Sequence, residues 1–304
     1  MDRVFIIIVT YNAEKWLDTC LSSFINMPEE WQLTVIDNGS EDNTIQIIEK
    51  KYSFVRLIEN KKNMGFGQAN NIGLQIALQE QAEYILLLNQ DAYIDQKNIL
   101  ELIHAHKENP DYYILCPLQY NGDKTDLDAA FKNYIKNLNN YFYDLILNKV
   151  EEIYSVSFCN AACWLMPVEC IRKIGGFSPV FFHYGEDDNY CNRVEYYGKK
   201  IGIVPQSLFC HDREFREPNT AFWNDFSRYY RRLLLKVSNP QKIGKKFFFE
   251  RTFLKLILNI VKYLLVFNFK KAKCYVNVLK LYYKNYSFIK ENAFNALNDK
   301  AYLK

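Results

Sequence analysis

The chain has 304 residues, of which 49% are hydrophobic and 24% charged, and its formal net charge is +3. This size allows one large domain or two smaller ones with a proper core. The small net charge provides no global basic field, which argues against a nucleic-acid partner. Tyrosine and phenylalanine are frequent, at 23 and 22 residues. That usage fits a carbohydrate-binding or membrane-facing surface, although low-GC coding would produce it as well.

The eight cysteines are scattered along the chain and form no Cys-x-x-Cys pair. No leader segment precedes the apolar run at Val4, so we expect mostly buried thiols in a reducing, cytoplasmic compartment. Cys159 and Cys163 could supply half of a zinc site, but the second pair of ligands is missing.

Apolar runs alternate with helical patterns over the first 119 residues. Short continuous apolar runs predict strands buried on both faces, and a period near 3.6 predicts amphipathic helices. The expected strands are 4–9, 33–36, 55–58, 84–88 and 114–117. The expected helices are 14–24, 42–51, about 67–79 and 98–108. This order with short loops predicts a parallel, doubly wound α/β sheet.

Polar residues follow three of the expected strands. They are Thr10, Tyr11 and Asn12 after the first strand, Asp37 and Asn38 after the second, and Asn89, Gln90 and Asp91 after the fourth. The carboxyl ends of parallel strands meet at one edge, where ligands bind, so we expect one shared crevice. In the Asn-x-Asp pair both side chains point to the same side, and oxygen ligands suit Mg²⁺ or Mn²⁺ shared with a phosphate. A plain strand-to-loop turn is the alternative.

The regular alternation of expected strands and helices is interrupted in the second half of the chain. Residues 120–152 are rich in Asn, Tyr, Lys and Asp and are interpreted as an inserted region facing the substrate. Further strands are expected at 155–158, 162–166, 201–204 and 208–210, and helices at 167–174, 186–197 and 222–236. We therefore divide the chain into a first half (1–119), a second half of the same domain (120–215), and a basic, aromatic helical region (216–304).

Lysines alternate with large apolar residues over 245–273 in the C-terminal region. The longest uncharged run is too short to cross a bilayer. Two interpretations stay open: the segment packs on the catalytic domain, or it lies on an anionic membrane with its lysines reaching the headgroups.

Five ordered motifs resemble family 2 glycosyltransferases of the GT-A fold. They are VTYNAEKWLDTCLSSF, VIDNGSEDNT, NKKNMGFGQANNIGL, LLLNQDAYI, and the later run from ACWLMPVECIRKIGGF to CHD, and together they cover residues 4 to about 212. The GFGQANN and LNQD forms are most similar to the rhamnosyltransferase-like branch. The resemblance implies a Rossmann-like, mostly parallel sheet flanked by helices, here with a C-terminal helical extension. It also implies inverting transfer from a nucleotide-diphospho-sugar, with residues 1–119 as the nucleotide-sugar-binding half and residues 120–215 as the acceptor and catalytic half of the same domain.

The resemblance implies roles for the residues around the diphosphate. Asp91 matches the metal-binding aspartate, and His211, after a late strand, completes the site for Mn²⁺ or Mg²⁺. Asn89 replaces an acidic residue, so it brings no charge and is expected to contact the nucleotide. Because the leaving diphosphate gains negative charge, such chemistry needs a cation there.

A carboxylate must accept the proton of the attacking hydroxyl. Glu186-Asp187 matches the family's acidic pair, with Asp187 as the expected general base. Where relatives carry a further acidic residue, this chain has Asn189, which could still meet Arg193 through a neutral hydrogen bond.

The remaining motif residues match the family's nucleotide site. Thr10, Tyr11 and Asn12 match the base-binding turn, and Asp37 matches an acid that accepts the N3–H of uracil or thymine, which favours a UDP- or dTDP-sugar. The other nucleotide-sugar-binding candidates are Asn38, Gly65, Phe66, Asn71, Asn89 and Gln90.

The expected acceptor is a hydroxyl of a glycan or lipid-linked glycan, with dTDP-rhamnose as one candidate donor. The expected location is the cytoplasm, with peripheral contact to the inner face of the membrane through the C-terminal region. A non-catalytic nucleotide- or carbohydrate-binding scaffold with a decayed site is the alternative, because Asn89 and Asn189 stand where acids are usual.

Overall fold

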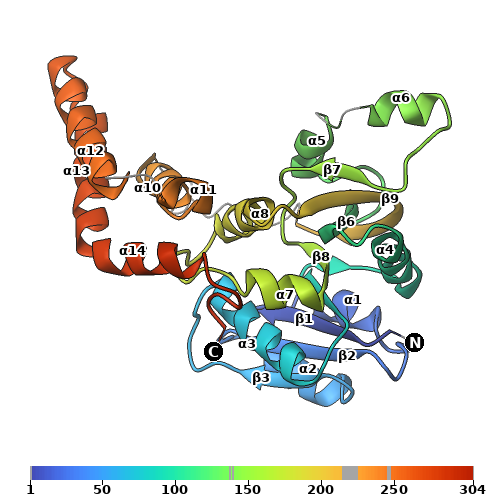
Figure 1. Ribbon diagram of the computed structural model, residues 1–304. Coiled ribbons are helices and arrows are strands. Elements are labelled where there is room, and N and C mark those ends of the chain that lie inside the picture. The colour runs from blue at the N-terminus through green and yellow to red at the C-terminus, as the bar shows by residue number, and fades with distance from the viewer. Residues whose placement is uncertain (1, 137, 139, 214–224, 245–247, 304) are drawn as a thin grey trace.

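A nine-stranded sheet forms the centre of the computed structural model, which describes residues 2–136, 138, 140–213, 225–244 and 248–303 (Figure 1). The strands are β1 (Val4–Thr10), β2 (Gln32–Asp37), β3 (Arg56–Glu59), β4 (Tyr84–Asn89), β5 (Ala92–Tyr93), β6 (Tyr112–Asn121), β7 (Tyr154–Val156), β8 (Cys163–Pro167) and β9 (Lys200–His211). Their order is β3-β2-β1-β4-β8-β6-β9-β5, and β7 pairs with β9. The mixed α/β architecture agrees with the sequence prediction.

The first four strands are parallel neighbours, as expected. The strand expected at 114–117 is part of β6, which does not pair with β4. Instead β8, from later in the chain, lies between β4 and β6 and runs antiparallel to both. All five of its residues are buried. A continuous apolar run marks a strand as central but encodes neither its neighbours nor its direction, so the order was not predictable from the pattern.

Helices cover both faces of the sheet. In the first 213 residues they are α1 (Leu17–Ser22), α2 (Thr44–Lys51), α3 (Phe66–Gln79), α4 (Gln96–Glu108), α5 (Ala129–Ile135), α6 (Tyr141–Ile146), α7 (Val168–Ile174) and α8 (Glu186–Tyr196). One core cluster unites the sheet with α3, α5, α7 and α8, and a second unites it with α1, α2 and α4. In β1, Phe5 and Ile7 belong to the first cluster and Ile6 to the second, as expected for a strand buried on both faces.

Several boundaries differ from the prediction, and two of them change the extent of an element clearly. The helix expected at 14–24 is regular only as α1, Leu17–Ser22. The strands expected at 201–204 and 208–210 are one strand, β9, because a register shift against β6 accommodates the residues between them.

One cysteine prediction is corrected. Cys116 and Cys159 form a disulfide, where thiols were expected, and Cys159 is therefore not half of a zinc site with Cys163. Cys116 lies in β6 and Cys159 lies 43 residues later, so only the packing of these segments brings the two together. Five of the other six cysteines are buried thiols.

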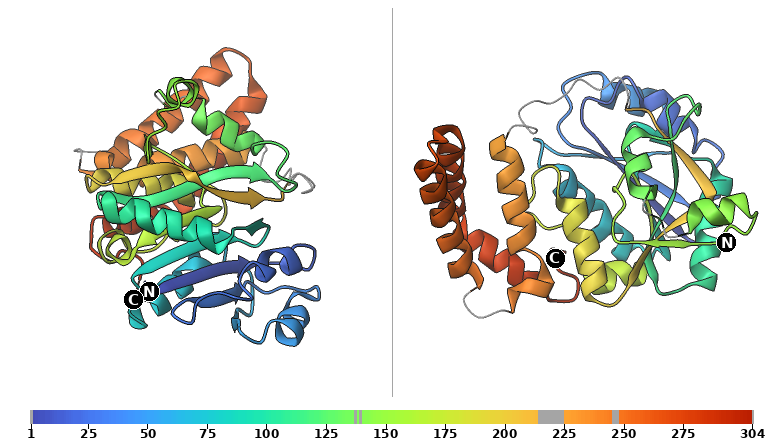
Figure 2. Two further views of the ribbon diagram at one scale, coloured as in Figure 1. Left: turned by 90° about the vertical axis from the view of Figure 1, so that its right-hand side faces the viewer. Right: turned by 90° about the horizontal axis from the view of Figure 1, so that it is seen from above.

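The C-terminal region forms a separate group of helices with its own core (Figures 1 and 2). The helices are α10 (Asp225–Val237), α11 (Pro240–Ile243), α12 (Phe248–Leu265), α13 (Phe269–Lys284) and α14 (Tyr286–Asn295). The first residues of the helix expected at 222–236, namely 222–224, lie outside the described residues. No helix in the described part of the chain has both the length and the apolarity to span a membrane.

Candidate active site

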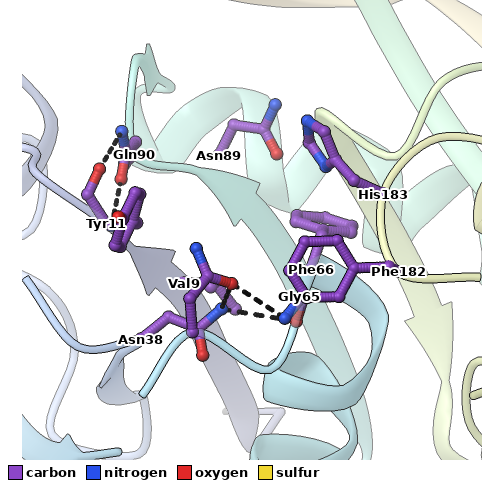
Figure 3. A pocket seen from close by; sticks show the side chains of 10 residues that line it. Val9, Tyr11, Asn38, Gly65, Phe66, Asn89, Gln90, Phe182 and His183 are labelled. Carbon is purple, nitrogen blue, oxygen red and sulfur yellow. Dashed lines mark hydrogen bonds between the residues drawn. The ribbon is translucent and has the colours of Figure 1, made fainter. Parts of the chain in front are cut away.

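A pocket of about 300 Å³ opens where β1 and β4 end and α3 begins (Figure 3). The edge is the one that the strand pattern predicts for a ligand. Its lining comes from five separate segments of the chain. The lining residues are Val9, Tyr11, Asn38, Asn63, Gly65, Phe66, Asn89, Gln90, Phe182 and His183. The predicted residues Tyr11, Asn38, Gly65, Phe66, Asn89 and Gln90 are therefore brought together around one cavity.

Tyr11 and Gln90 join the ends of β1 and β4 at one side of the pocket (Figure 3). The backbone N–H of Tyr11 donates to Gln90 Oε1 over 2.7 Å, and Gln90 Nε2 donates to the Tyr11 carbonyl over 3.3 Å. The Tyr11 side chain remains 43% exposed. A flat aromatic ring held at the mouth of a pocket is suited to stacking on a nucleobase.

Asn38 and Asn63 shape the loop that leads into α3. Asn38 Nδ2 donates to Asn63 Oδ1 over 3.0 Å, and Asn63 Oδ1 also accepts the N–H of Gly65. Gly65 has φ +85°, and a Cβ built on it would lie 2.1 Å from the carbonyl oxygen of Phe182. Glycine is therefore required, and the start of α3 points its N–H groups at the pocket, where an anion would be favoured.

Asp37 lies behind the pocket and is fully buried. Oδ1 accepts from the hydroxyls of Thr10 and Ser40, and Oδ2 accepts from the N–H groups of Gly39 and Ser40. A nucleobase N3–H would have to take the place of one of these donors, and either hydroxyl can rotate away.

Thr10 and Asn12 organise the turn and do not line the pocket. Thr10 is fully buried, with its hydroxyl on Asp37. The Asn12 side chain accepts the N–H of Glu41, and its own N–H donates to Ser40 Oγ. Both residues thus connect the ends of β1 and β2.

Asp91 and His211, the two residues expected to hold a metal, lie together just beyond the carboxyl end of β4. His211 Nε2 lies 3.3 Å from Asp91 Oδ1, and both side chains are at most 2% exposed. Gln119 Nε2, from β6, lies 2.5 Å from His211 Nδ1. An amide nitrogen can only donate, so Nδ1 accepts and the ring proton of neutral His211 is on Nε2, facing the carboxylate. A divalent cation held by Asp91 and His211 would require the other tautomer, in which Nε2 carries a lone pair and forms a donor set with the carboxylate.

Asn89 connects this pair to the pocket. Its Nδ2 lies 3.5 Å from His211 Nε2, and its side chain lines the cavity opposite His183 (Figure 3). Among the described residues, no cluster of three or more His, Cys, Asp or Glu side chains is arranged to hold a metal. A cation at Asp91 and His211 would therefore take its other ligands from donor phosphates and water.

Glu186 and Asp187 begin α8, directly after the loop that carries Phe182 and His183 into the pocket wall. Gly185 precedes them with φ +98° and makes the turn into the helix. Burial raises the pKa of both carboxyls, and the charge of Asp188 raises the pKa of Asp187 further. Two adjacent carboxyls with raised pKa beside a pocket are typical of an acid–base site.

The predicted contact between Asn189 and Arg193 is wrong. Asn189 Nδ2 donates to the hydroxyl and carbonyl of Ser238, at 3.1 and 3.2 Å. Arg193 is fully buried and donates to the carbonyls of Ile174 and Gly176. The i, i+4 spacing allowed the contact, but both side chains find partners on other elements.

Asn71, predicted near the nucleotide, also has another partner. Its Nδ2 donates to the Phe177 carbonyl over 2.8 Å, and its Oδ1 accepts the Phe177 N–H. It joins α3 to the loop before α8 and does not line the pocket.

Sequence reasoning missed Gln119 and Tyr134. Tyr134 belongs to α5, in the region interpreted only as an insertion. Burial, together with the charges of Asp187 and Asp128, raises the pKa of its hydroxyl to about 12. Arg213 Nε donates to Asp128 Oδ2 over 2.7 Å. No motif marks these residues, because they come from segments that only the tertiary structure brings to the site.

The profile of Glycosyl transferase family 2 matches residues 5–175, more than half of the chain. The chain belongs to glycosyl transferase family 2. It is 23% identical over 261 residues to the rhamnosyltransferase WbbL of Escherichia coli, an alignment that covers 82% of this chain and 97% of WbbL. The chain spans less than two thirds of several other curated relatives, so the activities of those whole proteins are not carried over.

Two solved structures share the fold of this family 2 chain. TarS 1–349 of S. aureus in complex with UDP-GlcNAc has a TM-score of 0.59 and 16% identity, over 98% of this chain and 84% of TarS. The mannosyltransferase PcManGT of Pyrobaculum calidifontis in complex with GDP-Man and Mn²⁺ has a TM-score of 0.54 and 18% identity, over 97% of this chain and 81% of PcManGT. The fold is GT-A, as the resemblance implied.

Proposed function

We propose that the protein is an inverting, metal-dependent glycosyltransferase that moves a sugar from a UDP- or dTDP-sugar to a hydroxyl. The observation that carries this proposal is the arrangement around the pocket. A nucleotide-sized cavity lies between the start of α3 and Asn89, the Asp91–His211 pair adjoins Asn89, and the Glu186–Asp187 pair follows the pocket wall.

In the proposed reaction the acceptor oxygen attacks the anomeric carbon as the bond from that carbon to the diphosphate breaks. The hydroxyl proton passes to the carboxylate of Asp187. Burial raises the pKa of Asp187, which makes its carboxylate a stronger base than an exposed aspartate. Inversion follows from a single displacement.

The diphosphate would be bound by the N–H groups at the start of α3 and by a Mn²⁺ or Mg²⁺ ion on Asp91 and His211. When bound, this ion stabilises the negative charge of the departing nucleotide. Gln119 positions His211, and Asn89 contacts the phosphate or ribose side without adding charge. The Mn²⁺ in the PcManGT complex supports a metal of this kind.

The donor base and the acceptor complete the proposal. Asp37 favours uracil or thymine, and the similarity to WbbL makes dTDP-rhamnose one candidate. The UDP-GlcNAc in the TarS complex supports a uridine donor equally. We propose a glycan or lipid-linked glycan acceptor at the cytoplasmic face of a membrane, and the three-part division at 1–119, 120–215 and 216–304.

A donor panel tests the proposal. UDP-, dTDP- and GDP-sugars are screened by thermal shift and by release of the nucleotide, with Mn²⁺ or with EDTA. We expect a UDP- or dTDP-sugar to stabilise the protein and be cleaved only with metal. Asp187→Asn should lower turnover by roughly 10²–10⁴-fold while donor binding persists. Glu49→Gln, on the exposed face of α2, is the matched control.

The outcome that contradicts the proposal is equally specific. If no sugar nucleotide is cleaved and Asp91→Ala leaves nucleotide binding unchanged, the non-catalytic scaffold is the better account of this site.

A further inference from the structure

The helices α12 and α13 form a hairpin that extends away from the sheet (Figures 1 and 2). They pack against each other and bury Leu256 on α12 and Val278 on α13. The hairpin turn, residues 265–269, lies at the end remote from α14. In this arrangement the main packing partner of α12 is α13, and the outer face of α12 is exposed in the described chain.

That outer face is apolar along its whole length. Its exposed residues follow the i, i+3, i+4, i+7 spacing of one helix face, and their exposed fractions range from 39% to 73%. They are Leu254, Ile257, Leu258, Val261, Leu264 and Leu265. The stripe continues into the turn, where Phe267 is 80% exposed and Phe269 63% exposed. A continuous exposed apolar stripe of this length marks an interaction surface.

The charge of the hairpin identifies the partner. Residues 251–284 contain eight Lys or Arg and no Asp or Glu. Arg251, Lys255 and Lys262 recur at i, i+4 and i+11, so they form a basic row beside the apolar stripe. Two copies of so basic a hairpin would repel each other across the stripe. An apolar face flanked by lysines matches a bilayer with anionic headgroups.

We infer that the α12–α13 hairpin is a lipid-binding element: the turn inserts Phe267 and Phe269 below the headgroups, and the basic row contacts anionic lipid. The inference deepens the proposed function, because it supplies the surface on which a lipid-linked acceptor would be met. It does not depend on catalysis, since the hairpin extends away from the sheet (Figure 1), and the pocket lies at the ends of two strands of that sheet.

Vesicle sedimentation of the full-length protein tests the inference. We expect binding to phosphatidylcholine vesicles that contain phosphatidylglycerol, weaker binding at high salt, and little binding to phosphatidylcholine alone. The double variant Phe267→Ser/Phe269→Ser should bind the anionic vesicles at least roughly tenfold more weakly than the wild type. Arg251→Gln/Lys255→Gln/Lys262→Gln should lose a similar amount together with most of the salt dependence.

Matched controls separate the hairpin from the rest of the surface. Ile146→Ser/Leu147→Ser changes an equally exposed apolar pair near α6, and Lys50→Gln/Lys97→Gln/Lys149→Gln removes three exposed lysines elsewhere. Both should bind like the wild type. The rate at which each variant releases nucleotide from the donor into water should equal that of the wild type, which shows that the variant is folded. Failure of this inference can therefore be told apart from failure of the proposed reaction.

Two results would overturn the inference. One is equal sedimentation of the wild type and the turn variant, including no binding by either. The other is a dimer, seen by light scattering, that the turn substitutions dissociate while no vesicle binding occurs.

Discussion

At the scale of single residues, the site depends on a few side chains with unequal charge. Asp91 is the acidic residue of the Asn-x-Asp pair, and His211 lies 3.3 Å from it. Asn89 reaches the same histidine but is neutral. The binding of a cation should therefore rest mainly on Asp91, whereas Asn89 contributes a hydrogen bond.

This division of roles predicts unequal losses. Asp91→Ala should reduce nucleotide release by at least about 10²-fold, because the charge of the leaving diphosphate loses its stabilisation. Asn89→Ala should cost about tenfold, the scale of one hydrogen bond to a charged group. Turnover measured across a Mn²⁺ titration checks both. Equal losses would show that the roles are divided wrongly.

The acidic pair at the start of α8 predicts the pH dependence. The base works as a carboxylate, and burial together with Asp188 raises the pKa of Asp187, so activity should fall with decreasing pH already above the usual aspartate range near 4. Asp188→Asn removes a repelling charge and should move this acidic limb to lower pH. Glu195→Gln, on the exposed face of α8, should leave the limb in place.

The pH profile of turnover is the measurement for this prediction. The groups around Asp187 include Glu186 and Tyr134, and burial raises the pKa of both. An acidic limb that does not move in Asp188→Asn would mean that another group acts as the base.

At the scale of elements, the pocket is a junction of loops held by side-chain to backbone hydrogen bonds. Asn38 and Asn63 hold the loop before α3, and Asn71 holds the loop before α8 through Phe177. Gly65, in the first loop, lies against the backbone carbonyl of Phe182, in the second. The start of α3 is thus positioned by contacts on both sides.

Gly65→Ala tests this junction. Its Cβ would meet the Phe182 carbonyl at 2.1 Å, and its φ of +85° is unfavourable for alanine, so the loops must separate. We expect donor affinity to fall by about tenfold or more, since a shift of the loops misplaces the N–H groups of α3. Gly244→Ala is the control, because a Cβ there meets nothing within 4 Å. Calorimetry with the sugar nucleotide that the donor panel identifies measures the two affinities. Equal affinities of Gly65→Ala and Gly244→Ala would contradict the role of Gly65.

At the scale of the whole molecule, the C-terminal segment returns to the catalytic domain. The Gly176 N–H donates to the Ala301 carbonyl over 2.8 Å. The guanidinium of Arg193 lies between the rings of Tyr190 and Tyr302, at 4.7 and 5.1 Å from their centroids. Arg193 has no carboxylate partner among the residues that the structure describes, so this buried cation depends on such contacts, which therefore couple the helical region to the loop before α8.

Tyr302→Ala should consequently destabilise the catalytic domain. Loss of the ring from both packing and the cation–π contact should lower the free energy of unfolding by about 2 kcal/mol. Urea unfolding measures this difference. Tyr143→Ala, at a ring that is 72% exposed, should change it by less than about 0.5 kcal/mol. Equal values for the two variants would mean that the C-terminal contact is not stabilising.

The sequence by itself determined the elements and most of the pocket. Continuous apolar runs such as that of β1 identify buried strands, and polar residues at their carboxyl ends converge because parallel strands share an edge. For that reason Tyr11, Asn89 and Gln90 could be assigned to one cavity before any coordinates. The pairing of Asp91 with His211 could be anticipated as well, through the family motifs.

Only the tertiary structure decided which polar side chains face the ligand and which hold the protein together. Asn71, Asn12 and Asn189 are the same residue type, yet each is occupied by a backbone or hydroxyl partner from another segment. Periodicity reports the face on which a side chain lies, but not the distant segment that packs there. The insertion of β8 between β4 and β6, the approach of Tyr134 to Asp187 and the exposed α12–α13 hairpin follow from such long-range packing, which no local pattern encodes.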